Sequence, residues 1–257
     1  MKYFIDTEFI EGKQDKTFLG IKYGETKPTI DLISIGIVSE EIILNQGNKQ
    51  ITIEEAANIN KTKEWYKKQE QKEYYAISKD FNLKAAWKNE WVRENVLGQI
   101  YIELLQMGGI CGDERNYWSF TQKNLKKLLQ WYGKTNKQIA QEIKDFVGNG
   151  KNSMQYPTNE FYGYYSDYDW VVFCQLFGTM MELPSGFPMY CNDLKQELDR
   201  LQKIENKKLP NNCNPMLNGQ SIADIKLYDE YPKQTNEHNA LADAKWNYEL
   251  YKFLNTI

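Results

Sequence analysis

Histidine is almost missing from this sequence, because His238 is the only one among 257 residues. Cysteine is scarce as well: the chain has four, and no two of them form a C-x-x-C pair. A zinc site made of cysteine and histidine therefore has too few candidate ligands. We expect the four cysteines to be free, mostly buried thiols in a reducing compartment.

Long apolar runs are absent too, since none approaches the roughly 18 residues that a membrane-spanning helix needs. The first residues, MKYFIDTEF, include neither the apolar stretch nor the cleavage site of a signal peptide, so we expect a cytoplasmic protein with no membrane partner. The loop GGICGDE has neither the G-x-G-x-x-G nor the P-loop spacing, and no phosphate role follows from it.

The chain also lacks an excess of positive charge, because its formal net charge is −3. The field of the whole molecule thus gives no sign of nucleic-acid binding, although a local basic face beside an acidic metal site stays compatible with it. Hydrophobic residues (41%) and charged residues (26%) are at ordinary globular levels. No repeat or linker divides the chain. We expect one domain over residues 1–257, with an inserted polar and helical elaboration at about 40–72.

Alternating, β-branched and aromatic residues predict three strands in the first third of the chain, at residues 2–10, 29–38 and 73–78. Three strands before any long helix indicate an antiparallel meander. The polar segment 40–72 between the second and third strands is predicted to be a short hairpin extension followed by a solvent-exposed helix. A lid over a functional site is the alternative.

Helical spacing begins at Leu83, and six residues are expected near one helix face: Trp87, Trp91, Val92, Val96, Ile100 and Leu104. Two helices broken at Gly133 follow within residues 121–147, and Thr121 is a candidate cap for the first. This stretch is locally basic. Its lysines are Lys123, Lys126, Lys127, Lys134 and Lys137, and they either face solvent or form a phosphate-binding patch.

The rest of the chain alternates strands and helices. We expect a strand at 159–165, a helix at 168–177, a strand at 189–192 with a helix after it, and a terminal helix that starts near His238. The whole order predicts an α/β protein with a mixed sheet and helices packed on it.

Two carboxylates stand close together in the first predicted strand. Asp6 and Glu8 are two residues apart, so their side chains point to the same face of a strand that is otherwise apolar. Two like charges at that distance raise each other's pKa unless a cation neutralises them. Hard oxygen ligands without thiolate or imidazole favour Mg²⁺ or Mn²⁺. The alternative is a frayed strand end that faces water.

The middle of the chain offers a further carboxylate in the stretch SDYDW. Asp169 is expected in the first turn of a helix that follows a strand, where the helix dipole favours negative charge. Asp167 is its rival, and either residue can also serve only as a turn or cap residue.

The terminal stretch HNALAD combines His238 with Asp243. Five residues correspond to about 500° of helical rotation, so the two do not stack as an i, i+4 pair. This spacing instead suits His238 in the loop or the first turn that enters the helix, with Asp243 one turn inside. An imidazole, which ordinarily titrates near about pH 6.5, can take a proton from water at neutral pH. A solvated histidine and a surface aspartate are the alternative.

The three motifs together resemble the DEDD superfamily of 3′-5′ exonucleases, in the subgroup whose third motif contains histidine. KYFIDTEFIEG, TIDLISIGIVSE, EYYAIS, YYSDYDWVVFCQLFG and HNALADAKWN look like the small bacterial and phage exoribonucleases of the ribonuclease AS group, over most of the chain. The second motif of the superfamily ends in an aromatic residue and an aspartate, which selects Asp169 over Asp167. Residues 40–72 depart from this group, in which a short turn joins the two strands.

This resemblance implies a ribonuclease H-like fold, a mixed five-stranded α/β sheet flanked by helices, with two divalent ions, Mg²⁺ or Mn²⁺, in the site. It implies that Asp6 bridges the ions, that Glu8 and Asp243 complete the first ion's ligands, and that Asp169 acts on the second. His238 is expected to take the proton from the attacking water. Thr7, Phe9 and His238 are the expected substrate contacts.

The implied partner is single-stranded nucleic acid, with RNA favoured, and the related group suggests a homodimer that exposed aromatics such as Trp65 and Trp131 could serve. Phe9 either stacks on the terminal base or packs in the core. Two other functions stay open: a DNA-directed exonuclease of the same family, and a non-catalytic nucleic-acid-binding module on the same fold. Digestion of matched RNA and DNA separates the first from an exoribonuclease, and binding without turnover identifies the second.

Overall fold

The structure is a computed structural model, and it describes residues 1–19, 21–41, 43–45, 50–51, 66–68, 71–110, 118–148, 159–208, 216–217, 220–221 and 224–257. Its strands are β1 (Lys2–Gly12), β2 (Asp15–Phe18), β3 (Ile21–Glu25), β4 (Thr29–Ser39), β5 (Ile43–Asn45), β6 (Gln50–Ile51), β7 (Tyr66–Lys68), β8 (Glu73–Ile77), β9 (Glu160–Gly163), β10 (Asn192–Asp193), β11 (Met216–Leu217) and β12 (Gln220–Ser221).

The helices are α2 (Leu83–Lys88), α3 (Glu90–Val92), α4 (Gly98–Met107), α5 (Gln122–Tyr132), α6 (Asn136–Val147), α7 (Asp167–Phe177), α8 (Leu194–Lys208) and α9 (Ala240–Leu254). A π-helical turn (Arg93–Leu97) joins α3 to α4, and a short 3-10 helix (Ile225–Leu227) precedes α9. Within the described ranges no helix combines the length and the apolar character that crossing a membrane requires.

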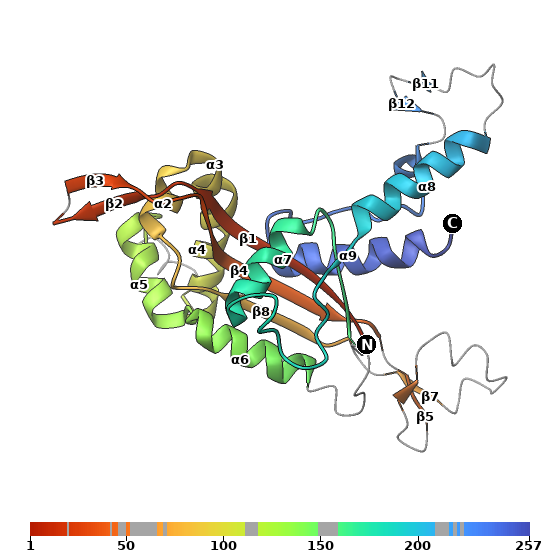
Figure 1. The fold of residues 1–257 in the computed structure, drawn as a ribbon, viewed down its shortest axis with the longest axis horizontal. Coiled ribbons are helices and arrows are strands. Elements are labelled where there is room, and N and C mark those ends of the chain that lie inside the picture. Colours follow the sequence, from red (N-terminus) through yellow and green to blue (C-terminus); the bar gives the residue numbers. More distant parts are fainter. Residues whose placement is uncertain are drawn as a thin grey trace.

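Five strands form one mixed sheet in the order β10-β9-β1-β4-β8 (Figure 1). β1 and β4 pair antiparallel at its centre, as do β4 and β8, whereas β9 runs parallel to β1 and β10 runs parallel to β9. The central strands are long because their β-branched and aromatic residues are buried on both faces. The predicted α/β fold with a five-stranded sheet flanked by helices is thus confirmed, and it is compatible with a ribonuclease H-like arrangement.

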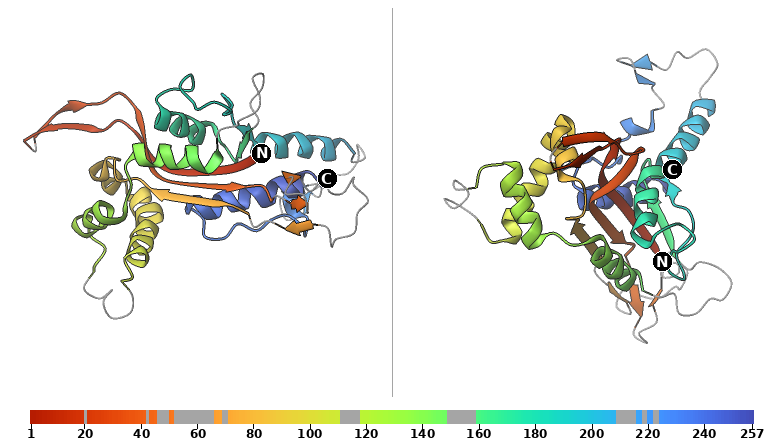
Figure 2. Two further views of the ribbon diagram at one scale, coloured as in Figure 1. Left: turned by 90° about the horizontal axis from the view of Figure 1, so that it is seen from below. Right: turned by 60° about the vertical axis from the view of Figure 1, so that its left-hand side comes forward.

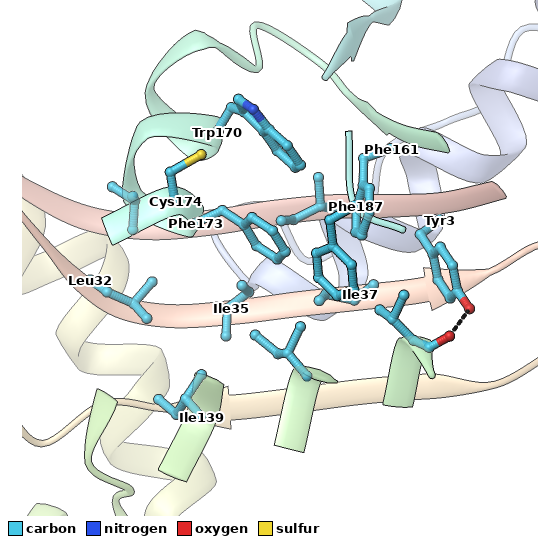
Figure 3. Packing of buried hydrophobic residues seen from close by; sticks show 14 of the residues in the cluster. Tyr3, Leu32, Ile35, Ile37, Ile139, Phe161, Trp170, Phe173, Cys174 and Phe187 are labelled. Atoms are coloured by element: carbon cyan, nitrogen blue, oxygen red, sulfur yellow. Dashed lines mark hydrogen bonds between the residues drawn. The ribbon is translucent and has the colours of Figure 1, made fainter. Parts of the chain in front are cut away.

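Helices cover both faces of the sheet, as its edge-on view shows (Figure 2). On one face, α6 and α7 pack around an aromatic cluster that includes Tyr3, Phe161 and Phe173 (Figure 3). On the other face, α4 and α5 cover the end of β8, and α9 lies over Phe4 and Val38. Each fully buried side chain of this size contributes roughly 1.5–3 kcal/mol, so the two layers hold the central strands firmly.

Most predicted elements lie where they were expected. The three early strands are β1, β4 and β8, and the two helices separated by Gly133 are α5 and α6. Thr121 caps α5, because its hydroxyl accepts a hydrogen bond from the backbone N–H of Asn124. Cys174 and Cys191 are free thiols, as predicted. The other two cysteines, at 111 and 213, and Trp65 lie outside the described residues.

One hairpin was missed, and one strand prediction was wrong. The β2–β3 hairpin, which projects from the body of the molecule in Figure 1, was not predicted, because its exposed residues show no buried face. The strand expected at 189–192 is reduced to β10. Met189 instead uses its carbonyl to accept a hydrogen bond from the indole Nε1 of Trp170, at 3.1 Å.

The predictions for the insertion and for Trp91 also need correction. β5, β6 and β7 form a three-stranded antiparallel sheet, so residues 66–68, which were placed in a helix, are a strand. Residues 52–65 and 69–70 of the insertion, which contain the rest of the predicted helix, lie outside the described residues. Trp91 is 53% exposed instead of buried, because Asn89 interrupts the helix and the π-helical turn changes its phase.

Candidate functional site

Three remote parts of the chain meet in one cavity of about 330 Å³, which we call the acidic pocket. β1 contributes one wall, the N-terminus of α7 a second, and the loop and first turns of α9 a third. The seven residues that the resemblance marked as metal ligands, base or substrate contacts all line this cavity: Asp6, Thr7, Glu8, Phe9, Asp169, His238 and Asp243. The structure therefore brings all seven together.

The closest approach among the carboxylates depends on a glycine. Asp6 and Glu8 point to the same side of β1, and Gly36 lies opposite Asp6 in the antiparallel register of β4. A Cβ atom on Gly36 would come within 2.2 Å of the carbonyl oxygen of Ala240. The missing side chain thus lets the first turn of α9 lie against β4. Ligand oxygens of Asp6, Glu8 and Asp243 consequently lie within 4.8 Å of one another.

Both carboxylate oxygens of Asp243 are oriented by neighbours. The backbone N–H of His238 donates to Oδ2 at 2.9 Å, and Nε2 of Gln234 donates to Oδ1 at 2.6 Å. Asn239 caps α9, since its Oδ1 accepts from the backbone N–H of Ala242 at 2.8 Å. These hydrogen bonds accompany His238 in the loop before the helix and Asp243 in its first turn, so the structure selects the loop from the two positions that the spacing left open for His238.

Asn247 fastens α9 to the strand that carries Asp6. It lies one turn after Asp243, and its Nδ2 donates to the carbonyl oxygen of Ile5 at 2.9 Å. This carbonyl belongs to the peptide that precedes Asp6. The other amide atom, Oδ1, is buried in the lining of the acidic pocket and has no hydrogen-bond partner among the described residues. Such an orphaned acceptor suits an ordered water or ligand at this place.

Asp169 reaches the pocket from the first turn of α7 and is buried. Its Oδ1 accepts two hydrogen bonds from Thr7, one from the backbone N–H at 3.0 Å and one from the hydroxyl at 2.5 Å. Thr7 therefore links the α7 carboxylate to the strand between Asp6 and Glu8. Asp167, the rival candidate, is exposed and does not line the pocket.

Burial raises the pKa values of all four carboxyls, and repulsion by the other pocket carboxylates adds to it for Asp6 and Glu8. For Asp6 the pKa lies well above its usual value because the group is desolvated and close to the charges of Asp169, Glu8 and Asp243. Burial, followed by the charges of Asp243 and Asp169, raises the pKa of Glu8 to about 8. Burial raises the pKa of Asp169 to about 6 against the opposing effect of the Thr7 hydrogen bonds. Burial also raises the pKa of Asp243.

Among the described residues, these carboxylates have no lysine or arginine as a counter-ion. A buried group of like charges is unfavourable by itself, and a bound cation relieves it. The donors are all hard carboxylate oxygens, which suit Mg²⁺ or Mn²⁺ better than Zn²⁺. The residues present therefore fit a divalent metal centre.

A strained loop holds His238 beside the carboxylates. Its φ is 66°, a conformation that non-glycine residues rarely adopt, and the surrounding structure must stabilise it. The ring of Trp91 meets the imidazole edge-on, with centroids 4.8 Å apart. Nε2 of Gln99 donates to the carbonyl oxygen of Glu237 at 2.8 Å. Both interactions come from the α3–α4 segment.

The π-helical turn allows one segment to make both interactions. Trp91 and Gln99 are eight residues apart, and on a regular α-helix they would point about 80° away from each other. The intervening turn, Arg93–Leu97, has the wider π-helical hydrogen bonding, so it rotates less per residue. The two side chains consequently reach the same loop. π-helical turns are often found at functional sites.

Aromatic side chains surround the mouth of the pocket. Phe9 is partly buried, and it packs against Tyr168 with ring centroids 5.8 Å apart. Tyr165 is 64% exposed at a positive φ of 55°, with its ring edge-on to Tyr164. Phe9 thus lines the pocket and also packs on the core, so the structure is compatible with both interpretations of this residue.

Four further residues of the site were missed by the sequence analysis. Asn247 stands at i+4 from Asp243, and this spacing was a signal that both face the same side. Gly36 stands in a buried strand, where a glycine often marks a close approach of backbone. Gln234 and Trp91 gave no such signal, because their roles depend on the loop conformation and on the π-helical turn.

Two proteins of Mycobacterium tuberculosis, from the strains CDC 1551 and H37Rv, are similar to this chain, and both are named 3′-5′ exoribonuclease. Each is 26% identical to it over 197 residues, which make up 76% of this chain and 73% of the relative. No protein-family profile matches the chain.

Proposed function

We propose that this protein is a metal-dependent 3′-5′ exoribonuclease that releases nucleoside monophosphates from single-stranded 3′ ends. The observation that carries this proposal is the convergence of Asp6, Glu8 and Asp243, with ligand oxygens within 4.8 Å, in the same pocket as Asp169 and His238. The similarity to two mycobacterial 3′-5′ exoribonucleases supports the activity and the RNA substrate. The order of the motifs supports the histidine-containing DEDD subgroup and a likeness to the ribonuclease AS group.

Asp6, Glu8 and Asp243 are the residues that would hold the divalent ions, and Asp169 contributes the fourth carboxylate. When bound, Mg²⁺ or Mn²⁺ ions supply positive charge that stabilises the attacking and leaving oxygens of the phosphodiester. Thr7 keeps Asp169 in place through its two hydrogen bonds. Gln234 and the backbone of His238 keep both oxygens of Asp243 oriented. The pocket thus offers a rigid set of donors.

His238 is the residue that takes the proton from the attacking water. The water oxygen bonds to phosphorus, the bond between phosphorus and O3′ breaks, and O3′ takes a proton from solvent. The shortened strand therefore ends in a 3′ hydroxyl, and His238 passes its proton to solvent. The loop geometry supports this role, because Trp91 and the Gln99–Glu237 hydrogen bond restrict the imidazole to a position beside Asp243. Proton transfer from a fixed base contributes roughly 10²–10⁴ in rate.

Digestion of matched single-stranded RNA and DNA by the purified protein tests the proposal. With Mg²⁺ or Mn²⁺ we expect nucleoside 5′-monophosphates to be released from the 3′ end of RNA, faster than from DNA. Addition of EDTA should stop the release. Absence of mononucleotide products from both substrates, at several metal concentrations, would refute an exonuclease. Faster digestion of DNA would keep the chemistry and refute the RNA preference.

A further inference from the structure

A second cavity, of about 540 Å³, lies between α2, α5 and the end of β8. Four exposed lysines line it, Lys79, Lys84, Lys123 and Lys126, and the described residues of its lining include no carboxylate. We call it the lysine groove. Phe81, which is buried, also lines it, so the cationic rim surrounds an apolar base. The groove gathers positive charge in a protein whose formal net charge is −3.

The two groove lysines on α5 have no acidic residue near them in the sequence, whereas Lys79 is followed by Asp80, whose Oδ2 accepts a hydrogen bond from the backbone N–H of Asn136. From residue 118 to residue 141 the chain has five lysines and no acidic residue. Within the described ranges, none of the four groove lysines forms a salt bridge. Nearby Lys88, in contrast, pairs with Asp15 at 2.6 Å. Unpaired cations on one surface create a local field that attracts a polyanion.

The walls of the groove are held rigidly together. The backbone N–H of Lys134 donates to the carbonyl oxygen of Ile77, and that of Lys79 donates to Lys134, at 2.9 and 2.8 Å. These bonds join the end of β8 to the segment after α5. Gly133 permits the close approach, because a Cβ atom there would lie only 3.1 Å from the Cβ atom of Lys79. The lysine backbones therefore keep a fixed spacing.

A cavity of about 250 Å³ adjoins the groove, and its lining approaches the acidic pocket along β1; we call it the path. Ile10 on β1 and Asn89 at the start of α3 line it. Its lining also includes Glu11 and Asp15, and Asp15 is paired with Lys22 and Lys88. On β1, Ile10 follows Phe9 of the acidic pocket, and two residues after Asn89 comes Trp91, which touches His238. At its other end, this cavity shares Lys84 with the lysine groove.

We propose that the lysine groove binds phosphates in the 5′ portion of a single-stranded RNA whose 3′ end occupies the acidic pocket. This inference rests on the proposed function and adds a second, sequence-independent binding region to it. The path is long enough to matter: Glu8 to Gly12 alone covers roughly 13 Å at about 3.3 Å per strand residue. A di- or trinucleotide therefore ends before the lysines, whereas a longer strand reaches them.

The double variant K123E/K126E tests this proposal on two substrates, a dinucleotide and a single-stranded RNA of about 20 nucleotides, with Mg²⁺ or Mn²⁺ present. For the long RNA we expect KM to rise about tenfold or more, with kcat unchanged. For the dinucleotide we expect both constants to be unchanged. The slope of log Kd against log salt for the long RNA should become shallower by about 0.7 for each phosphate that the groove no longer neutralises.

A matched control has the same change of charge elsewhere. K203E/K226E alters two exposed lysines on α8 and the 3-10 helix, away from the groove, and it should leave the long-RNA KM unchanged. The neutral variant K123Q/K126Q should give a smaller rise and serves if the charge reversal fails to fold. Equal KM values for groove and control variants would overturn the groove while the exonuclease stands. A native protein inactive on both substrates would instead overturn the proposed function.

Discussion

The acidic pocket and the lysine groove each concentrate one sign of charge, but they hold it by different means. In the pocket, β1, α7 and α9 place four carboxylates close together, and burial raises the pKa of each. In the groove, the lysines are exposed on α2, α5 and the end of β8, and only their backbones are fixed. The carboxylates of the pocket are therefore fixed in position, whereas the lysine side chains of the groove can adjust to the positions of bound phosphates.

This difference has consequences for stability and for binding. Buried like charges destabilise the folded chain until a cation neutralises them, and removal of one changes all the others. Exposed lysines contribute little to stability, and each adds a salt-dependent increment to polyanion binding. Replacing a pocket carboxylate should consequently abolish turnover. Replacing groove lysines should lower the affinity for RNA in small steps, one for each lysine.

The largest expected effect is the loss of activity in a variant of Asp169, and a variant of Asp167, two residues earlier, should not show it. Asp169→Asn, like Asp6→Asn or Asp243→Asn, should abolish nucleotide release, because each removes a carboxylate from the pocket. Asp167→Asn should retain native activity, since this side chain is exposed and outside the pocket. Release of labelled mononucleotide with saturating Mn²⁺ measures the effect. The inactive variants should melt at or above the native temperature in EDTA, and equal activities for Asp167→Asn and Asp169→Asn would contradict the assigned ligand set.

Loss of the imidazole should have the next largest effect. His238→Ala should lower kcat by roughly 10²–10⁴, because the general base is gone while the carboxylates remain. Metal binding, followed by the rise in melting temperature with Mn²⁺, should be nearly unchanged. KM for long RNA should also stay within about twofold, since the groove is intact. A large loss of metal affinity would indicate that His238 is a ligand and not the base.

The third prediction concerns how the pocket is assembled. Gly36→Ala places a Cβ against the backbone of α9, so the helix has to shift to avoid the clash. We expect this shift to lower the free energy of unfolding by about 1–3 kcal/mol and Tm by about 3–10 °C. Displacement of Asp243 by even about 1 Å should reduce kcat by up to about 10². Gly24→Ala, where a Cβ meets open space, is the matched control and should be neutral. Native kcat in Gly36→Ala would show that α9 need not lie so close.

The sequence predicted the chemistry of the pocket better than its construction. Strand periodicity was enough to place Asp6 and Glu8 on one face, and the spacing of His238 and Asp243 was enough to place His238 at the entry to the helix and Asp243 one turn inside. The first two inferences depend on local geometry, which short stretches of sequence determine well. Asp169 was selected over Asp167 by the resemblance to the second motif of the superfamily.

The missed features depend on long-range geometry. Gly36 matters only because the register sets it opposite Asp6 and α9 crosses β4 there. Trp91 was assigned to a buried face because nothing in the residues announces a π-helical turn. The sequence could not decide whether the lysines of α5 face solvent or form a phosphate-binding patch. The groove also needs Lys79 and Lys84, which lie far away in the sequence.

Burial and repulsion of the pocket carboxylates should make the stability of the metal-free protein depend on pH. The folded-state pKa values of Glu8 and Asp169, about 8 and about 6, lie above the unfolded values near 4. The folded state therefore binds more protons, and without metal the free energy of unfolding should fall as the pH rises from about 4 to about 8. Thermal melts in EDTA at several pH values measure this fall.

Added Mn²⁺ and the variant Glu8→Gln should each weaken the pH dependence of stability, for different reasons. Saturating Mn²⁺ should raise Tm most at the high end of this range, because it neutralises the carboxylates there. Glu8→Gln should flatten the profile of stability against pH in EDTA, because it removes one of the titrating carboxyls. Variants of the lysine groove should leave the profile as it is. A native protein whose stability in EDTA stays constant across this range would mean that the four carboxylates are not mutually destabilising.

The smallest expected effect belongs to Trp91, which lies two residues after Asn89 of the path. Its edge-on packing against His238 is worth roughly 0.5–1.5 kcal/mol, so Trp91→Ala should lower kcat by up to about tenfold. Trp91→Phe keeps an aromatic edge and should recover most of this loss. If Trp91 acts by positioning the imidazole, the decrease in kcat will be equal for a dinucleotide and a long RNA. An effect confined to KM for the long RNA would instead assign Trp91 to the path toward the groove, and the restraint on His238 would then come from the Gln99–Glu237 hydrogen bond alone.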